Sequence, residues 1–346
     1  MILAADVGGT KTLMGIFMQK KKGKVKSLFQ KEYKSQDYDS FENLLRGFLS
    51  DLEHEPKLTT NEKFIGVACF GMAGLIEKYQ DGKHFCKLTH PEKWPAVTET
   101  NLSNMLRGVQ VYLLNDMIAI GYGVSQLGDK DLLVLNPGIP KQGNCAVIAA
   151  GTGLGKVKLI LKDGEYYSSP SEGGHANFAP SYDKDDLQLK LLGYLHNKIQ
   201  GNVGFERVLS GEGLVNIYEF LRELGGQESA ELRERLDKME KKDDRAQIIS
   251  EAALAKTEPL CVKALDVFMS IYGSAAGDLA LHDCTIGGIY IGGGIAPKNW
   301  KKMPDGTFMK AFEAKEKSLP HAEIPVKVIK NEKVGLLGAA WYAAKT

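Results

Sequence analysis

Two glycine-rich turns carry the clearest chemical signal in the sequence. Apolar residues 2–5 lead into Asp6-Val7-Gly8-Gly9-Thr10-Lys11, and apolar residues 145–150 lead into Gly151-Thr152-Gly153-Leu154-Gly155. Each pattern places small residues directly after a strand, where backbone N–H groups can approach an anion such as phosphate. Two such turns far apart predict two similar halves, each with a phosphate-binding hairpin, and a nucleotide bound between them.

A carboxylate that could act on a substrate follows a strand expected at 109–114. Asn115 and Asp116 come directly after it, at the strand end where open α/β sheets bind ligands. Asp116 can accept a proton from a substrate hydroxyl and orient its oxygen toward phosphorus, while the amide of Asn115 can hold a neighbouring hydroxyl. The same dipeptide also suits an Asx turn or the N-cap of the next helix, so both interpretations stay open.

Two further loops contain residues that suit sugar recognition. Ser171-Glu172-Gly173-Gly174-His175 places a carboxylate and an imidazole on one glycine bend, and such a pair can bond adjacent sugar hydroxyls. A surface loop with an incidental histidine is the alternative. Glu206 precedes another turn, where a helix-end salt bridge is the alternative. Metal binding by His175 is disfavoured because no Cys/His cluster with ligand spacing lies nearby.

Composition narrows the class of protein. The 346 residues suffice for two domains, and 43% hydrophobic with 25% charged residues is ordinary for a soluble globular protein. A net charge of +1 predicts neither a nucleic-acid nor a membrane partner. Five scattered cysteines without a CxxC pair, no N-terminal apolar signal segment and no apolar run of about 18 residues predict a cytoplasmic protein.

Alternating strands and helices must position these residues. Strands are expected at 2–6, 12–18, 27–33, 64–70 and 109–114, with a flexible turn at 71–74 and a helix at 41–52. The second half repeats the plan, with strands at 146–150, 156–161 and 286–291 and helical stretches near 183–200, 212–224 and 245–281. The charged segment 222–245 predicts a solvated surface helix. The small-residue helix at 334–343 is expected to pack on the N-terminal domain.

With these motifs in order, the chain resembles the bacterial glucokinase family, within the superfamily of sugar kinases, actin and chaperone ATPases. The matching motifs span essentially the whole chain. They are Asp6-Val7-Gly8-Gly9-Thr10, Leu114-Asn115-Asp116, Ala150-Gly151-Thr152-Gly153-Leu154-Gly155, Glu172-Gly173-Gly174-His175, Glu206-Arg207-Val208-Leu209-Ser210-Gly211, Gly213-Leu214-Val215-Asn216-Ile217-Tyr218, Ile291-Gly292-Gly293-Gly294-Ile295-Ala296-Pro297 and Gly335-Leu336-Leu337-Gly338.

The resemblance implies an α/β fold of the two-lobed, actin-like ATPase type, a duplicated ribonuclease H-like unit with a ligand cleft between lobes. The small lobe would comprise residues 1–115 and 334–346, and the large lobe residues 116–333. The implied reaction is phosphorylation of the 6-hydroxyl of glucose by ATP with Mg²⁺, at the entry to glycolysis. The family also implies a homodimer.

The resemblance also implies a role for each matching residue. Asp116 would be the general base, and Asp6 would organise Mg²⁺ through its water shell. The remaining sugar hydroxyls would be held by Asn115, Glu172, His175 and Glu206. The phosphate hairpins would be formed by Gly8, Gly9 and Thr10 and by Gly151, Thr152 and Gly153, and the adenosine would be approached by Gly292, Gly293 and Gly294.

Some segments depart from the glucokinase pattern. The Gly-Gly-Thr-Lys-Thr turn and the 71–74 loop also resemble acetylglucosamine-kinase-like ATPases, and the segment near Thr89-His90-Pro91 matches poorly. A kinase of another hexose or amino sugar therefore remains an alternative. A second alternative is a non-catalytic sugar-sensing regulator. It is disfavoured because the core begins at residue 2, with no DNA-binding segment ahead of it, and because Asp116 is present.

Overall fold

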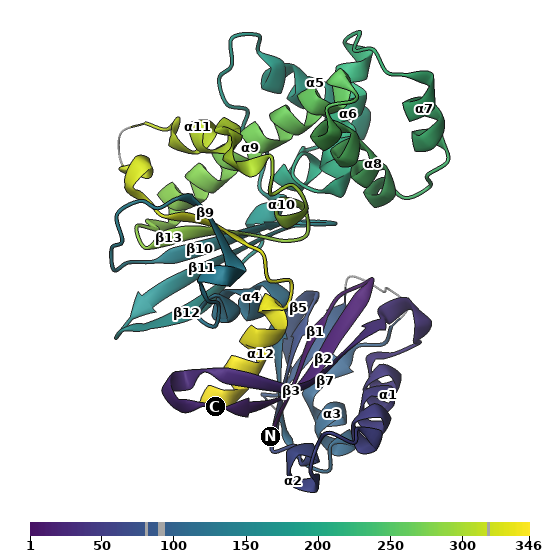
Figure 1. Ribbon diagram of the computed structural model, residues 1–346, viewed down its shortest axis with the longest axis vertical. Coiled ribbons are helices and arrows are strands. Elements are labelled where there is room, and N and C mark those ends of the chain that lie inside the picture. The colour runs from purple at the N-terminus through teal and green to yellow at the C-terminus, as the bar shows by residue number, and fades with distance from the viewer. Residues whose placement is uncertain (80–81, 89–93, 317–318) are drawn as a thin grey trace. The chain divides into compact units, whose positions relative to one another are not determined.

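The computed structural model describes residues 1–79, 82–88, 94–316 and 319–346, so the segment at Thr89-His90-Pro91 lies outside the described residues. The chain divides into two compact units (Figure 1). The first comprises Met1–Gly128, Tyr166–Pro170 and Asn331–Thr346, and the second comprises Asp129–Glu165 and Ser171–Lys330.

The first unit is built on a five-stranded sheet in the order β3-β2-β1-β4-β8. Its strands are β1 (Ile2–Val7), β2 (Lys11–Gln19), β3 (Val25–Lys34), β4 (Val67–Met72) and β8 (Gln110–Asn115), and a smaller sheet contains β5 (Gly74–Lys78), β6 (His84–Leu88) and β7 (Val97–Thr98). The helices are α1 (Phe41–His54), α2 (Thr60–Lys63), α3 (Glu99–Met105), α4 (Asp116–Val124) and α12 (Val334–Lys345).

Strand alternation gives this sheet two apolar faces. Leu3, Ala5 and Val7 of β1 join a buried cluster with α1, whose residues at helical spacing are buried as the sequence predicts. Ile2 and Ala4 join a second cluster with α12. Figure 1 shows α12, the last element of the chain, lying across this sheet. The predicted return of the C-terminal helix to the N-terminal domain is therefore confirmed.

Glycine allows α12 and α4 to touch. A Cβ at Gly338 would collide with the carbonyl oxygen of Ala119, and one at Gly123 would collide with that of Val334. Because α4 packs on α12 in this way, the structure groups residues 116–124 with the first unit, whereas the sequence placed the lobe boundary before them. The division into lobes of 1–115 with 334–346 and 116–333 stays a prediction.

A second sheet has the strand order β12-β11-β10-β13-β14-β9 and repeats the plan of the first. The second unit contains its strands β9 (Leu132–Asn136), β10 (Cys145–Ala150), β11 (Leu154–Lys162), β13 (Gly288–Gly292) and β14 (Val326–Ile329), whereas residues 166–170 of β12 (Glu165–Ser171) are grouped with the first unit. Its helices are α5 (Leu187–Ile199), α6 (Gly211–Glu223), α7 (Ala230–Asp237), α8 (Lys242–Ala255), α9 (Pro259–Asp283), α10 (Ile295–Lys298) and α11 (Thr307–Glu313). In both units an antiparallel hairpin is followed by parallel strands, so the predicted duplicated α/β fold is confirmed.

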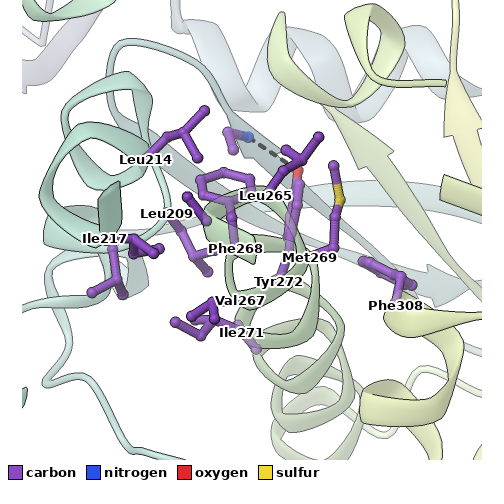
Figure 2. Close-up of a cluster of buried hydrophobic side chains, with 14 of the residues drawn as sticks. Leu209, Leu214, Ile217, Leu265, Val267, Phe268, Met269, Ile271, Tyr272 and Phe308 are labelled. Atoms are coloured by element: carbon purple, nitrogen blue, oxygen red, sulfur yellow. Dashed lines mark hydrogen bonds between the residues drawn. The ribbon is translucent and has the colours of Figure 1, made fainter. Parts of the chain in front are cut away.

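Helix α9 forms the centre of the second core. Leu265, Phe268 and Tyr272 lie among side chains from α6 and α11 (Figure 2). Within the described residues, α9 alone is long and apolar enough to cross a membrane, but most of it is buried inside this unit. Such burial is typical of the core helix of a folded domain.

Two local expectations differ from the structure, and the solvated helix expected in the charged segment is confirmed. The stretch 245–281 is two helices, because Lys256 adopts a left-handed φ of 56° and Pro259 begins α9. The expected turn at 71–74 is mostly strand: Gly71 pairs with Asp6 and Leu114 inside the sheet. The charged segment contains α7, which buries only Leu232 and Leu236.

Candidate active site

The first glycine turn is fixed from behind by Ser35. The N–H of Gly8 donates to the carbonyl oxygen of Lys11 at 3.0 Å, closing the β1–β2 hairpin. The hydroxyl of Ser35 donates to the carbonyl oxygen of Gly8 at 2.6 Å, and its N–H donates to that of Thr10 at 3.0 Å. Gly8, Gly9 and Thr10 therefore form a braced turn whose carbonyl groups at 8 and 10 are engaged.

Asn115 is the N-cap of the next helix, as one interpretation of the dipeptide predicts, and the catalytic role of Asp116 stays a prediction. β8 ends at Asn115, and α4 begins at Asp116. Asn115 is the N-cap of α4, with its Oδ1 accepting from the N–H of Met117 at 3.0 Å, and its Nδ2 donates to the carbonyl oxygen of Gly74 at 3.1 Å. The cap fixes the first turn of α4 and therefore the backbone that carries the Asp116 carboxylate.

Asp6 and Asp116 interact electrostatically within the first unit. The pKa of Asp6 is raised to about 7, mainly by burial and then by the charge of Asp116, while Lys11 opposes the shift. In the sheet, β4 lies between β1, which carries Asp6, and β8, which leads into Asp116. Next to Asp6, β4 carries Gly71, where a Cβ would meet the Cβ of Ala119 at 3.0 Å. The strand that separates the two carboxylates therefore places no side chain between them.

The second glycine turn is closed by its own backbone and by the start of α6. Gly151 donates its N–H to the carbonyl oxygen of Gly153 at 2.8 Å, and the N–H of Gly211 donates to the carbonyl oxygen of Gly151 at 2.9 Å. The hydroxyl of Thr152 donates to Oδ2 of Asp243, the second residue of α8, at 2.9 Å. Three segments of the second unit therefore meet at this turn.

The third glycine turn lies beside the second. Parallel pairing aligns Gly292 with Ala149. Gly293 has a left-handed φ of 78°, and a Cβ there would collide with the carbonyl oxygen of Ala150. A Cβ on Gly151 would lie 4.0 Å from the backbone nitrogen of Gly294. The structure therefore brings together Gly151, Thr152 and Gly153 with Gly292, Gly293 and Gly294.

The buried side chain of Tyr272 in α9 forms hydrogen bonds with the backbone at both of these turns. Its hydroxyl oxygen accepts from the N–H of Ala150 at 3.1 Å, drawn as a dashed line in Figure 2. The hydroxyl also lies 3.2 Å from the carbonyl oxygen of Ile148 and 3.3 Å from that of Gly292. Burial raises the pKa of Tyr272 above its ordinary value, so the hydroxyl keeps the proton that it donates.

The predicted sugar-binding residues of the second unit lie in loops that adjoin the second glycine turn. Oε2 of Glu206 accepts from the N–H of Leu154 at 3.0 Å, and a Cβ at Gly153 would lie 2.6 Å from this oxygen. Nε2 of His175 lies 3.9 Å from Oε2 of Glu172, and their side chains are 66% and 76% exposed. The two loops are joined by the N–H of Phe205, which donates to the carbonyl oxygen of Ala176 at 2.8 Å.

Lys156 is a buried cation that the sequence analysis missed. It is 7% exposed, and its Nζ lies 4.7 Å from the centre of the Phe205 ring. Burial lowers the pKa of its ammonium group. Its side chain lies against Gly173, where a Cβ would be 3.1 Å from Cδ. Lys156 therefore contacts residues of both predicted sugar loops. Its burial could have been predicted, because side chains alternate along a strand and Lys156 lies on the same face of β11 as Leu154.

The predicted residues are divided between the units. The first unit carries Asp6, the Gly8–Thr10 turn, Asn115 and Asp116, and the second carries the rest. No group of three or more His, Cys, Asp and Glu side chains able to hold a metal occurs in the part of the chain that the structure describes.

The duplicated sheet with a glycine hairpin in each half is the architecture of sugar kinases with the actin-like ATPase fold. A glucokinase from an Antarctic psychrotroph has a TM-score of 0.81 at 27% identity, covering 100% of this chain and 99% of the other. A ROK family glucokinase from Streptomyces griseus, solved with glucose and AMPPNP, shares the fold with a TM-score of 0.62 at 20% identity, covering 100% and 99%.

Sequence similarity identifies the family. The model of the glucokinase family matches residues 3–346. A curated glucokinase from Nostoc sp. is 37% identical over 359 residues, covering 100% of this chain and 99% of that protein. This chain belongs to the glucokinase family.

Proposed function

We propose that this protein is an ATP-dependent glucokinase that transfers the γ-phosphoryl group of ATP to the 6-hydroxyl of glucose. The observation that carries the proposal is the match to the glucokinase family along the chain, together with a curated glucokinase at 37% identity. The braced glycine turns and the carboxylate at the end of β8 support the same reaction.

In this reaction Asp116 is the general base. As the hydroxyl oxygen attacks phosphorus, its proton must pass to a group within hydrogen-bond reach. The carboxylate of Asp116 is oriented by the N–H of Met117, which donates to Oδ1 at 2.8 Å. The N-terminus of α4 favours its negative charge, and that charge attracts the proton. Phosphoryl transfer depends mostly on positioning and charge neutralisation, so one base suffices.

The other proposed residues bind and orient the substrates. Asn115, Glu172, His175 and Glu206 hold the remaining sugar hydroxyls, with Asn115 keeping one Nδ2 hydrogen beyond the bond to Gly74. The phosphates lie on the turns at Gly8–Thr10 and Gly151–Gly153. The adenosine lies against Gly292–Gly294, where side chains are absent.

The residues of the first unit fit a magnesium ion. Asp6 provides a hard carboxylate oxygen, and Mg²⁺ in kinases uses one or two carboxylates together with substrate phosphates. Burial and the charge of Asp116 raise the pKa of Asp6, and a bound cation would oppose this shift. Asp6 would hold Mg²⁺ through its water shell, and the ion would neutralise charge on the transferred phosphoryl group.

We also propose, from the family resemblance, a homodimer located in the cytoplasm. Light scattering coupled to gel filtration measures the mass in solution. A mass twice the 37.9 kDa of the chain supports the dimer, and a mass equal to the chain opposes it.

Product analysis tests the proposed reaction. Purified protein is incubated with Mg-ATP and glucose, and the product is examined by phosphorus NMR with proton coupling. A phosphate coupled to the two protons on carbon 6 is expected. A phosphate on carbon 1, or release of inorganic phosphate alone, would contradict the proposal.

A further inference from the structure

The charged segment 222–245 ends at a contact with the second glycine turn. α8 begins at Lys242, and the carboxylate of Asp243 accepts a hydrogen bond of 2.9 Å from the hydroxyl of Thr152, 91 residues earlier. Thr152 stands between Gly151 and Gly153. The segment therefore meets the backbone to which the proposed function assigns phosphate binding.

This contact belongs to a closed ring of interactions. Oδ1 of Asp243 occupies the space that a Cβ on Gly211 would need. Gly211 in turn donates its N–H to the carbonyl oxygen of Gly151 at 2.9 Å. Asp243 thus fixes Thr152 by a hydrogen bond and contacts the residue that fixes Gly151. Gly151 and Thr152 are therefore held against α6 and α8.

The neighbouring charges do not neutralise Asp243. Lys242 pairs with Glu212, and Arg207 pairs with the same carboxylate at 3.1 Å. Within the described residues Asp243 has no ion pair with Lys, Arg or His. A carboxylate beside a phosphate-binding turn repels phosphate, so its charge would not favour nucleotide binding. The useful property of Asp243 is its ability to accept the Thr152 hydrogen bond.

We propose that Asp243 is a positioning residue of the nucleotide site, which acts through Thr152 to keep the Gly151–Gly153 turn in its phosphate-binding shape. The inference rests on the proposed function, because it takes ATP as the ligand of this turn. A turn held in its binding shape loses less conformational entropy when the nucleotide binds. Loss of the hydrogen bond therefore weakens ATP binding and leaves glucose binding unchanged.

Asp244 provides a matched control. It is the next residue of α8, it is exposed, and it lies in the same first helical turn. Both carboxylates lie in the first turn of α8, where negative charge stabilises a helix through its dipole. If replacing Asp243 weakens ATP binding and replacing Asp244 does not, the effect comes from the contact with Thr152. The loss of a negative charge at the start of the helix would be the same in both variants.

The experiment measures ATP affinity by calorimetry, and KM for ATP and glucose, in purified full-length variants. Asp243→Ala and Thr152→Val are expected to weaken ATP binding about 5- to 20-fold, the effect of about one hydrogen bond. KM for glucose should change less than about twofold. Asp243→Asn keeps an oxygen that can accept the hydrogen bond and should remain within about threefold of the wild type, as should Asp244→Ala.

A double variant completes the test. Asp243→Ala combined with Thr152→Val should bind ATP no more weakly than either single variant, because both remove the same bond. The inference would be overturned if the losses of ATP affinity in the two single variants multiplied in the double variant. It would also be overturned if Asp243→Asn lost as much ATP affinity as Asp243→Ala, or if Asp243→Ala bound ATP as well as Asp244→Ala. If the wild type itself binds no ATP, the proposed function fails as well. If the wild type binds ATP and phosphorylates glucose, only the role of Asp243 is in question.

Discussion

The carboxylate of Asp6 fills the space beside Gly335 that any larger residue would need. A Cβ on Gly335, the second residue of α12, would lie 2.5 Å from Oδ2 of Asp6. The sequence separates these residues by the length of the chain, yet they meet in the first unit. The N-terminus of α12, with its partial positive charge, therefore adjoins a carboxylate proposed to organise Mg²⁺.

Replacing Gly335 by alanine should displace this carboxylate. We expect Gly335→Ala to lower kcat at least tenfold, because catalysis by positioning is sensitive to shifts of about 1 Å, and to lower Tm. Steady-state kinetics and thermal melting measure both effects. Gly193→Ala in α5 is the control, since a Cβ there meets nothing within 4 Å and alanine favours a helix. Equal activity in the two variants would contradict the placement of Asp6.

The raised pKa of Asp6 predicts a pH-dependent cost in stability. The pKa of Asp6 is about 7 in the folded chain against 3.8 ordinarily. The folded state thus holds a proton that the unfolded state releases, and stability from this group falls as pH rises from about 4 to about 7. Asp6→Asn should therefore raise the Tm of the unliganded protein by several degrees at pH 8 and by less at pH 5. For the exposed Asp129, Asp129→Asn should shift Tm by the same amount at both pH values. A difference in Tm between Asp6→Asn and the wild type that does not change with pH would refute this account.

Asp116 is expected to affect turnover more than sugar binding. Asp116→Ala should lower kcat about 10²- to 10⁴-fold, the usual contribution of a general base. Glucose affinity, measured by intrinsic fluorescence or calorimetry, should stay within a few-fold of the wild type. Exposed Asp39→Ala serves as the control. Near-normal turnover in the Asp116 variant would exclude its role as the base.

Replacing His175 should raise KM for glucose and leave KM for ATP unchanged. Its imidazole lies in an exposed loop with Glu172. Removing a hydrogen-bonding partner of a sugar hydroxyl should raise KM for glucose about 10-fold or more in His175→Ala, with KM for ATP within about twofold. His282→Ala, an exposed histidine at the end of α9, is the comparison. An increase confined to KM for ATP would show that the sugar residues are wrongly assigned.

The sequence predicted features that depend on neighbouring residues. Glycine at 8, 9, 151 and 153, directly after apolar runs, marked the two strand-to-strand turns. The apolar spacing of 41–52 predicted α1, and the small residues of 334–343 predicted close contact with another element. The repeated order of hairpin and parallel strands followed from the two matched turns.

Contacts between distant segments could not be predicted in the same way. Asp243 lies in a run of charges, and its contact with Thr152 depends on how α8 docks. Tyr272 is one aromatic residue in a buried helix, and only the fold shows that its hydroxyl reaches Ala150. The break between α8 and α9 depends on a left-handed Lys256, for which the sequence carries no strong signal beyond Pro259.

The most direct test of the central claim measures ADP release by the wild-type protein with Mg-ATP and a panel of sugars. The panel contains glucose, mannose, fructose, glucosamine, N-acetylglucosamine and N-acetylmannosamine. The account predicts the highest kcat/KM with glucose and little ADP release without sugar. A higher kcat/KM with another sugar would contradict the assignment of glucose. ADP release that no sugar stimulates would contradict the kinase itself and favour a sugar-sensing protein.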